Sequence, residues 1–372
     1  MAIHELVVDY AVPLAGQPGV GHNRWHPDIP PVVRCAPGDE VVMDTRDALD
    51  GQITPASTAD DVARTDLGVV HPLTGPVYVD GAEPGDLLVV DVIDVTPPDF
   101  GFTVQIPGFG FLRDVFPDPH IIRWDLADRW AVSDDLPGVR IPAAPFLGTF
   151  GVAPSRDLMA QITAREQDLL DRGGVVLPPD PAGAVPDDPA IASEALRTVP
   201  PRENAGNVDI KQCGVGARLF LPVWTEGGLF SAGDAHYAQG DNESCGTAIE
   251  IRATFRLRFD VRKGEARERN IRRLRFERSD YPVAPEFAAP QRFYATTGLS
   301  IDAEGVNRSE DVTAATREAL VEMIDYLTTE RGYDRQQAYA ICSVAVDLRI
   351  SELPDVPNMV VTAMLPTAIF GG

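Results

Sequence analysis

The sequence is short of cysteine, of lysine and of long apolar runs, and each shortage excludes a class of protein. Its four cysteines, Cys35, Cys213, Cys245 and Cys342, are widely spaced and form no Cys-x-x-Cys pair. Neither a zinc knuckle nor a disulfide scaffold is therefore expected. No apolar stretch approaches the roughly 18 residues of a membrane span, and no signal-like segment opens the chain. We expect a soluble, cytoplasmic protein with no membrane partner.

Positive charge is also scarce. The chain has 32 Lys and Arg against 56 Asp and Glu, a formal net charge of −24. Such a surface repels phosphate backbones, so nucleic acid is excluded as a partner. The only lysines are Lys211 and Lys263, and neither lies in a Gly/Ser-rich segment, which argues against a Ser-Ser-Lys amidase. No Gly-x-Ser-x-Gly elbow, phosphate loop or dinucleotide fingerprint is found either.

Proline and glycine, in contrast, are abundant, with 33 and 32 residues. This composition favours many turns and short strands. We predict a mostly β protein with an α+β C-terminal part, built as a β-sandwich or a barrel-like fold. The expected regions form one interwoven globular unit: a β-rich N-terminal region (1–155), a short helix with a Pro/Asp-rich loop (156–200), a central β region carrying the site (201–265) and an α+β region (266–372).

Three helices are expected. The first covers about 157–170. The second begins near Ser309 and ends at Gly332, and the third is capped by Asp334 and runs to about Ile341. The apolar run 344–350 then predicts a buried strand, whereas the glycine-rich segment 101–110 is expected to be a loop near a site.

The densest candidate for chemistry is the segment 233–250. In extended backbone, residues two apart point to the same face, so Asp234 with His236, and Asp241 with Glu243, can each present two polar side chains to one cavity. Carboxylates with one imidazole suit zinc, manganese or a similar divalent ion. The alternative is an exposed turn, because Gly, Asp and Asn are common in loops. The flanking apolar strands favour a rigid site.

The same segment also carries a family likeness. The run Gly-Asp-x-His, Gln-Gly-Asp-x-Glu, Cys-Gly-Thr-Ala-Ile-Glu resembles the signature of the acetamidase/formamidase family. Further matching blocks occur in one order along the chain, at residues 44–48, 50–52, 71–77, 81–86, 106–110, 206–209 and 343–351. One departure is Asn242, which stands where that family usually has glycine. Its side chain is expected to narrow the pocket while the turn survives.

The resemblance implies hydrolysis of formamide, acetamide or a related small amide to a carboxylate and an amine, in a β-rich homo-oligomer. It further implies a metal, with zinc named first, held by Asp209, Asp234 and His236. Glu243 would then be the general base that takes a proton from the attacking water and returns it to the leaving amine.

The resemblance also implies roles for residues around this metal site. His71 and the backbone around Gly108 would hold the amide or its oxyanion, and Asp44 with Arg46 would orient the ligands. Gln239 and Asn242 are candidate substrate-binding residues. Asp347 interrupts an apolar run and needs a partner, for which Arg349 on the same strand face is expected; this pair is either catalytic or structural.

Two alternatives remain open. One is a metal-independent amidase or γ-lactamase that uses a carboxylate or a cysteine, with Cys245 and Cys342 as the stronger nucleophile candidates. The other is a non-catalytic protein that binds a metal or small molecule on the same fold. His22, His26 and His120 are expected to be surface or packing residues.

Overall fold

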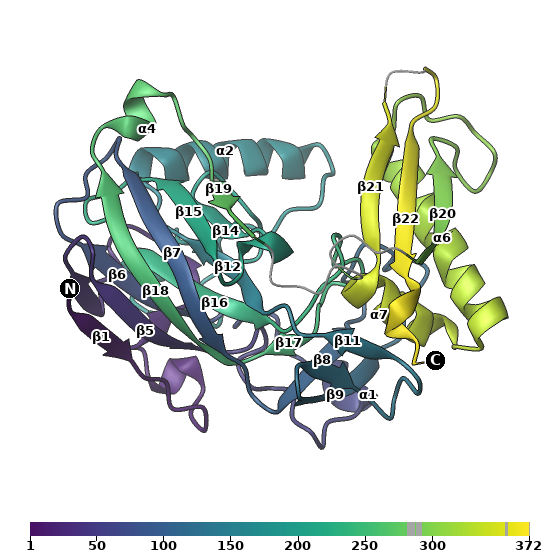
Figure 1. Cartoon of the computed structure of the whole chain (residues 1–372). Helices are drawn as coiled ribbons and strands as arrows, with labels where there is room; N and C mark the ends of the chain where they lie inside the picture. Colours follow the sequence, from purple (N-terminus) through teal and green to yellow (C-terminus); the bar gives the residue numbers. More distant parts are fainter. Residues whose placement is uncertain (281–286, 288–291, 354–355, 372) are drawn as a thin grey trace.

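Two large β-sheets pack face to face, and a smaller α+β unit stands beside them at the C-terminal end (Figure 1). This arrangement is seen in a computed structural model that describes residues 1–280, 287, 292–353 and 356–371. Phe230 and Phe259, one from each sheet, meet edge to face with ring centroids 5.3 Å apart. The sandwich prediction is confirmed, and the described strands close no barrel.

The first sheet has six strands. Its order is β1 (Ile3–Leu6), β5 (Glu40–Thr45), β18 (Ala253–Arg262), β7 (Leu87–Thr96), β15 (Ala217–Pro222) and β19 (Arg275–Arg278). β18 alternates buried apolar residues with arginines, as expected of a strand with one face on the core. Both β5 and β7 follow a Pro-Gly-Asp turn, as the sequence predicts.

The second sheet has eleven strands and carries the polar segment. Its main path is β11 (Arg140–Pro142), β10 (Trp130–Val132), β9 (His120–Ala127), β8 (Phe100–Gln105), β17 (Glu250–Ile251), β16 (Phe230–His236), β12 (Phe146–Gly151) and β14 (Ala205–Asn207). β6 (Leu73–Val79) branches from β16 and pairs with β2 (Gly21–His22) and β4 (Val33–Cys35). Three strands, β17, β12 and β6, therefore contact β16.

Smaller elements complete the fold. A two-stranded sheet joins β3 (Arg24–Trp25) to β13 (Leu196–Arg197), and the C-terminal sheet has the order β20 (Phe293–Leu299), β22 (Val360–Pro366), β21 (Asp347–Glu352). The α-helices are α1 (Ala59–Val62), α2 (Arg156–Asp171), α3 (Pro189–Ala192), α4 (Glu265–Glu268), α6 (Val312–Arg331) and α7 (Arg335–Ala345). The 3-10 turns are η1 (Leu14–Gly16), η2 (Lys211–Cys213) and η3 (Thr367–Ile369). Within the described ranges, no helix is long and apolar enough to cross a membrane.

The three predicted helices are confirmed as α2, α6 and α7. Asp311 caps α6 by accepting from two backbone amides, and Gly332 ends it with a φ of 76°. Asp334 forms a capping box with Gln337 at the start of α7. Strong caps explain why these helices were found from the sequence.

Two local predictions were wrong. α7 continues to Ala345, so Val344 is helical, and β21 begins only at Asp347 with Ile350 58% exposed. A short apolar run cannot separate a buried helical turn from a strand. The first half of the expected loop at 101–110 is also strand, because β8 runs to Gln105. A β-carbon on Gly101 would lie 3.0 Å from the Glu250 carbonyl oxygen, so this glycine marks a close strand approach.

Candidate active site

A buried group of carboxylates surrounds one imidazole at the end of β16. His236 Nε2 lies 3.3 Å from Asp234 Oδ1, 3.3 Å from Glu250 Oε1 and 3.7 Å from Glu243 Oε1. Asp209 joins the same group, because one of its carboxylate oxygens lies within 4.8 Å of a carboxylate oxygen of Asp234 and of a ring nitrogen of His236. We call Asp209, Asp234, His236, Glu243 and Glu250 the carboxylate cluster.

The strands place these side chains. Asp234 and His236 lie on β16, and Glu250 of β17 is the register partner of His236 across the ladder. The polar segment thus begins on a strand, where we had expected a turn between strands. The same-face prediction is confirmed for Asp234 and His236. It is wrong for Asp241, which turns away to Gln212 and Lys211 while Glu243 faces the cluster.

Three of the cluster's carboxylates sit on left-handed backbone. The φ angles are 47° at Asp209, 54° at Asp234 and 54° at Glu243. For a residue with a β-carbon this conformation costs roughly 1–2 kcal/mol, and it persists only where the surroundings enforce it. Strain of this kind, gathered on residues that converge on one point, is typical of a functional site.

Gln239 fixes the orientation of His236. Its Oε1 lies 2.9 Å from His236 Nδ1, and its Nε2 donates to the Asp209 carbonyl oxygen at 2.9 Å. With the amide so anchored, Oε1 can only accept, so Nδ1 of His236 carries a proton and the ring is held with Nε2 facing the carboxylates. Gln239 was predicted to bind substrate, and the structure instead places it against His236.

His71 approaches the cluster from the loop before β6. Its Nδ1 lies 3.9 Å from Asp234 Oδ2 and 3.5 Å from Thr149 Oγ1. Thr149 in turn lies 2.9 Å from Asp234 Oδ2 and 2.7 Å from Asn207 Oδ1. The side chains of His71 and Glu243 are 12% and 17% exposed, against 1–3% for Asp234, His236 and Glu250, so solvent reaches the cluster from their side.

Burial and mutual charge shift the pKa values of the cluster strongly. Burial, aided by neighbouring carboxylates, raises the pKa of Asp209, Glu243 and Glu250. Burial alone would lower the pKa of His236, but Glu250 and Asp234 outweigh it and the pKa stands well above its usual value. For Asp234 burial is outweighed by His71 and His236, and its pKa is depressed. Burial lowers the pKa of His71, which is neutral at pH 7.

Two buried carboxylate oxygens of the cluster, Asp209 Oδ1 and Glu250 Oε2, have no hydrogen-bond partner among the residues that the structure describes. Unpaired buried oxygens of this kind are costly unless a proton or a cation satisfies them. The donor set of one imidazole and several carboxylates suits a divalent ion, and two overlapping triads are compact enough to hold one: Asp209, Asp234, His236 and His236, Glu243, Glu250. The residues present therefore fit a metal.

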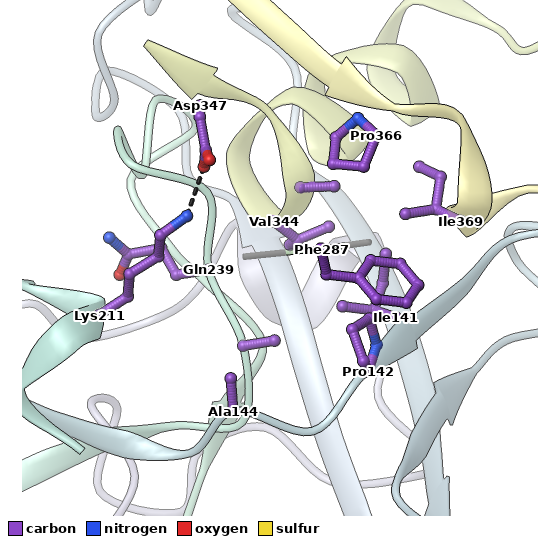
Figure 2. A pocket seen from close by; sticks show the side chains of 12 residues that line it. Ile141, Pro142, Ala144, Lys211, Gln239, Phe287, Val344, Asp347, Pro366 and Ile369 are labelled. Carbon is purple, nitrogen blue, oxygen red and sulfur yellow. Dashed lines mark hydrogen bonds and ion pairs between the residues drawn. The ribbon is translucent and has the colours of Figure 1, made fainter. Parts of the chain in front are cut away.

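Four predicted residues lie away from the cluster. Asp44 accepts from Thr254 Oγ1 at 2.6 Å in the six-stranded sheet, and Gly108 lies on an exposed turn. Asn242 does not narrow the pocket, since its amide binds backbone at the end of α7, and the left-handed position of its turn is Glu243. Asp347 pairs with Lys211 rather than Arg349, beside a cavity of about 50 Å³ (Figure 2).

Sequence reasoning missed four residues. Glu250 closes the Cys-Gly-Thr-Ala-Ile-Glu block, and an acid at the end of an apolar run was the available signal. Gly148 belongs to the site because a β-carbon there would lie 2.7 Å from Asp209 Oδ1. It comes from β12 with Thr149, and Asn207 comes from β14, far from residues 233–250 in sequence. Only the β12–β16 and β12–β14 pairings bring them together.

The cysteines are poor nucleophile candidates. Cys245 and Cys342 are buried, and burial raises the pKa of both thiols. Cys245 Sγ faces the backbone oxygens of Val104 and Thr247. The structure therefore disfavours the cysteine alternative.

Comparison with known proteins gives a consistent answer. A sequence model described as the Acetamidase/Formamidase family matches residues 7–372. An acetamidase of Mycolicibacterium smegmatis is 38% identical over 364 residues, 90% of this chain and 87% of the relative. A formamidase of Methylophilus methylotrophus is 37% identical over 374 residues, 95% and 90% of the two chains. Among solved structures, a gamma lactamase from Delftia acidovorans superposes with a TM-score of 0.93 at 36% identity, covering 100% of this chain and 94% of that one.

Proposed function

The chain belongs to the acetamidase/formamidase family, and we propose that its carboxylate cluster hydrolyses a short linear amide, of the formamide or acetamide type, to a carboxylate and ammonia. The observation that carries this proposal is a buried imidazole among carboxylates, with one open side and with two carboxylate oxygens that find no partner in the described part of the chain. The similarity to relatives named acetamidase and formamidase supports the hydrolysis of linear amides as the general reaction.

We assign the metal to Asp209, Asp234 and His236, with zinc named first because imidazole with carboxylate is a common zinc donor set. A divalent cation there would offset the repulsion among the carboxylates and polarise the amide carbonyl. Gln239 holds the His236 ring with Nε2 facing that position.

Glu243 has the role of general base. Its carboxylate, partly exposed on the open side of the cluster, takes a proton from the attacking water and returns it to the leaving nitrogen. His71 is neutral, and with its Nδ1 proton directed at Thr149 Oγ1 its Nε2 accepts from the amide NH2. Together the two side chains orient the amide with its carbonyl carbon facing the water.

We place the protein in the cytoplasm, where its four unpaired cysteines stay reduced, and expect a homo-oligomer as in the family resemblance. A second candidate function is opening of a γ-lactam ring. It is favoured by the similarity to the gamma lactamase, whose fold this chain matches over its whole length. The same groups would act, since a lactam is a cyclic amide.

The test is ammonia release from formamide, acetamide and propionamide, with ring opening of a γ-lactam, before and after exhaustive chelation. We expect chelation to abolish turnover and added zinc to restore it. Full activity in chelated protein shown by elemental analysis to be metal-free would overturn the metal assignment. Bound metal without hydrolysis of any of these substrates would instead favour a binding protein.

A further inference from the structure

The loop that carries Glu243 is tied to the C-terminal unit along its length. We call residues 240–245 the Glu243 loop. Five of its backbone groups are bonded to α7 or β21. The bonds join Gly240 N to Ser343 O (2.9 Å), Asp241 N to Asp347 Oδ1 (3.1 Å), Asp241 O to Leu348 N (3.4 Å), Cys245 N to Ser343 Oγ (3.2 Å) and Ser244 O to the Tyr339 hydroxyl. The position of Glu243 therefore depends on a part of the chain about 100 residues further on.

The side chain of Asn242 adds three further hydrogen bonds to those of the loop backbone. Its Nδ2 donates to the carbonyl oxygens of Cys342 at 3.0 Å and Val346 at 2.6 Å, at the C-terminal end of α7. Its Oδ1 accepts from Ser244 N at 2.6 Å. One amide thus joins the end of a helix to the loop on both sides of Glu243.

The side chain of Glu243, in contrast, points toward the carboxylate cluster. Its backbone is left-handed, with a φ of 54°, and its carbonyl oxygen accepts from Gly246 N at 2.9 Å. Its carboxylate lies 3.7 Å from His236 Nε2. A glutamate does not favour this backbone, so the neighbours that hold residues 242 and 244 also hold the direction of the carboxylate.

We propose that Asn242 is a positioning residue, which locks Glu243 in its left-handed conformation and so aims the carboxylate at the reacting water. The inference rests on the proposed function, in which Glu243 moves the proton. Asp347 supports the same loop from the other side: Lys211 pairs with its carboxylate, which also accepts from Asp241 N (Figure 2). The C-terminal unit is then a support for the catalytic base.

Asn242→Gly is the direct test, because glycine removes the amide and leaves the backbone free to adopt the same turn. We expect kcat to fall about 10-fold and KM to stay within about 2-fold, since a misdirected base affects the reacting state more than binding. Hydrogen exchange of the peptide spanning residues 239–247 should become faster. If N242G does not accumulate as folded protein, N242S is measured in its place against the same expectations.

Asp334→Ala is the matched control. It removes the N-cap at the opposite end of α7 and touches neither the loop nor the cluster. We expect a comparable fall in Tm, unchanged kcat and unchanged exchange of the 239–247 peptide. A loss of kcat in D334A equal to that in N242G would overturn the proposal, because general loosening of α7 would then explain both.

A double-mutant cycle separates this inference from the proposed function. If Asn242 acts through Glu243, N242G causes no further loss of kcat in a Glu243→Gln background. Independent, multiplying losses would overturn the positioning role while leaving Glu243 as the base. Wild-type kcat in N242G with accelerated loop exchange would also overturn it. Wild-type turnover in E243Q would instead remove the proposed function, and the catalytic part of this inference with it.

Discussion

The carboxylate of Asp209 lies against Gly148 of β12, in space that a β-carbon at residue 148 would fill. A β-carbon at Gly148 would lie 2.7 Å from Asp209 Oδ1, and also 2.7 Å from His236 Cε1. Both contacts are shorter than β-carbons make in practice, and both neighbours belong to the carboxylate cluster. A single methyl group at this position therefore displaces two of the assigned metal ligands at once.

Gly148→Ala should accordingly lower both bound metal and turnover, with kcat/KM falling about 100-fold. Elemental analysis and ammonia release measure the two effects. Gly19→Ala is the control, because a β-carbon there meets no atom of the described residues within 4 Å. A G148A protein with full metal content and wild-type turnover would show that the cluster tolerates displacement and is not the reaction centre.

Gln239→Leu removes the acceptor that faces His236 Nδ1 while keeping a similar volume. We expect about 10- to 100-fold weaker metal binding, because the imidazole loses the bond that fixes its tautomer and direction. Gln239→Glu keeps an oxygen for Nδ1 and should retain more affinity. Competition with a metal-binding dye gives the affinities, and Gln167→Leu on α2 serves as an unrelated glutamine control. Equal affinities in wild type and Q239L would contradict the orienting role.

Cys245→Ala tests the metal-independent route. Since the thiol is buried and its pKa is raised, we expect kcat to stay within about 3-fold and stability to fall by roughly 1 kcal/mol from lost packing. Steady-state kinetics and thermal unfolding measure these. Loss of all turnover in C245A, with structure and metal content preserved, would return the cysteine nucleophile to consideration.

Glu40 provides a pH-dependent contribution to stability that is independent of the site. Its buried carboxylate accepts from Arg258 and Arg256, and these bonds hold its pKa below the usual 4.5. The stabilisation is present above pH 4.5 and is lost as pH falls through the lower folded pKa.

Glu40→Gln should therefore destabilise the protein by roughly 1 kcal/mol at pH 7 and by less at pH 3, the value being modest because both arginines are partly exposed. Urea unfolding at the two pH values measures the difference. Exposed Glu330→Gln on α6 is the control. An equal loss at both pH values would contradict the charge-based explanation.

The sequence predicted those features that local chemistry determines. The cap at Asp334, the stop at Gly332 and the β-rich class all follow from short-range patterns. The pairing of Asp234 with His236 also follows, because both lie on one strand face. What failed depends on long-range packing: α7 extends past Ile341 because its last turn is buried, which apolar periodicity alone does not show.

The site was predicted in part for the same reason. The motif block 233–250 supplied Asp234, His236 and Glu243, whereas Thr149 and Gly148 enter through strand pairing between distant segments. Asp347 was recognised as an acid in need of a partner, but Lys211 was not foreseen because 136 residues separate the two. Asn242 looked like a pocket residue and instead binds the end of α7.

The most direct measurement is the turnover of Glu243→Gln with acetamide or formamide, made on protein whose metal content and fold match the wild type. Glutamine keeps the shape of Glu243 but takes up no proton, so we expect kcat to fall at least about 100-fold while the bound metal stays unchanged. Wild-type kcat in a folded, fully metallated E243Q protein would contradict the assignment of Glu243 as the base that drives amide hydrolysis.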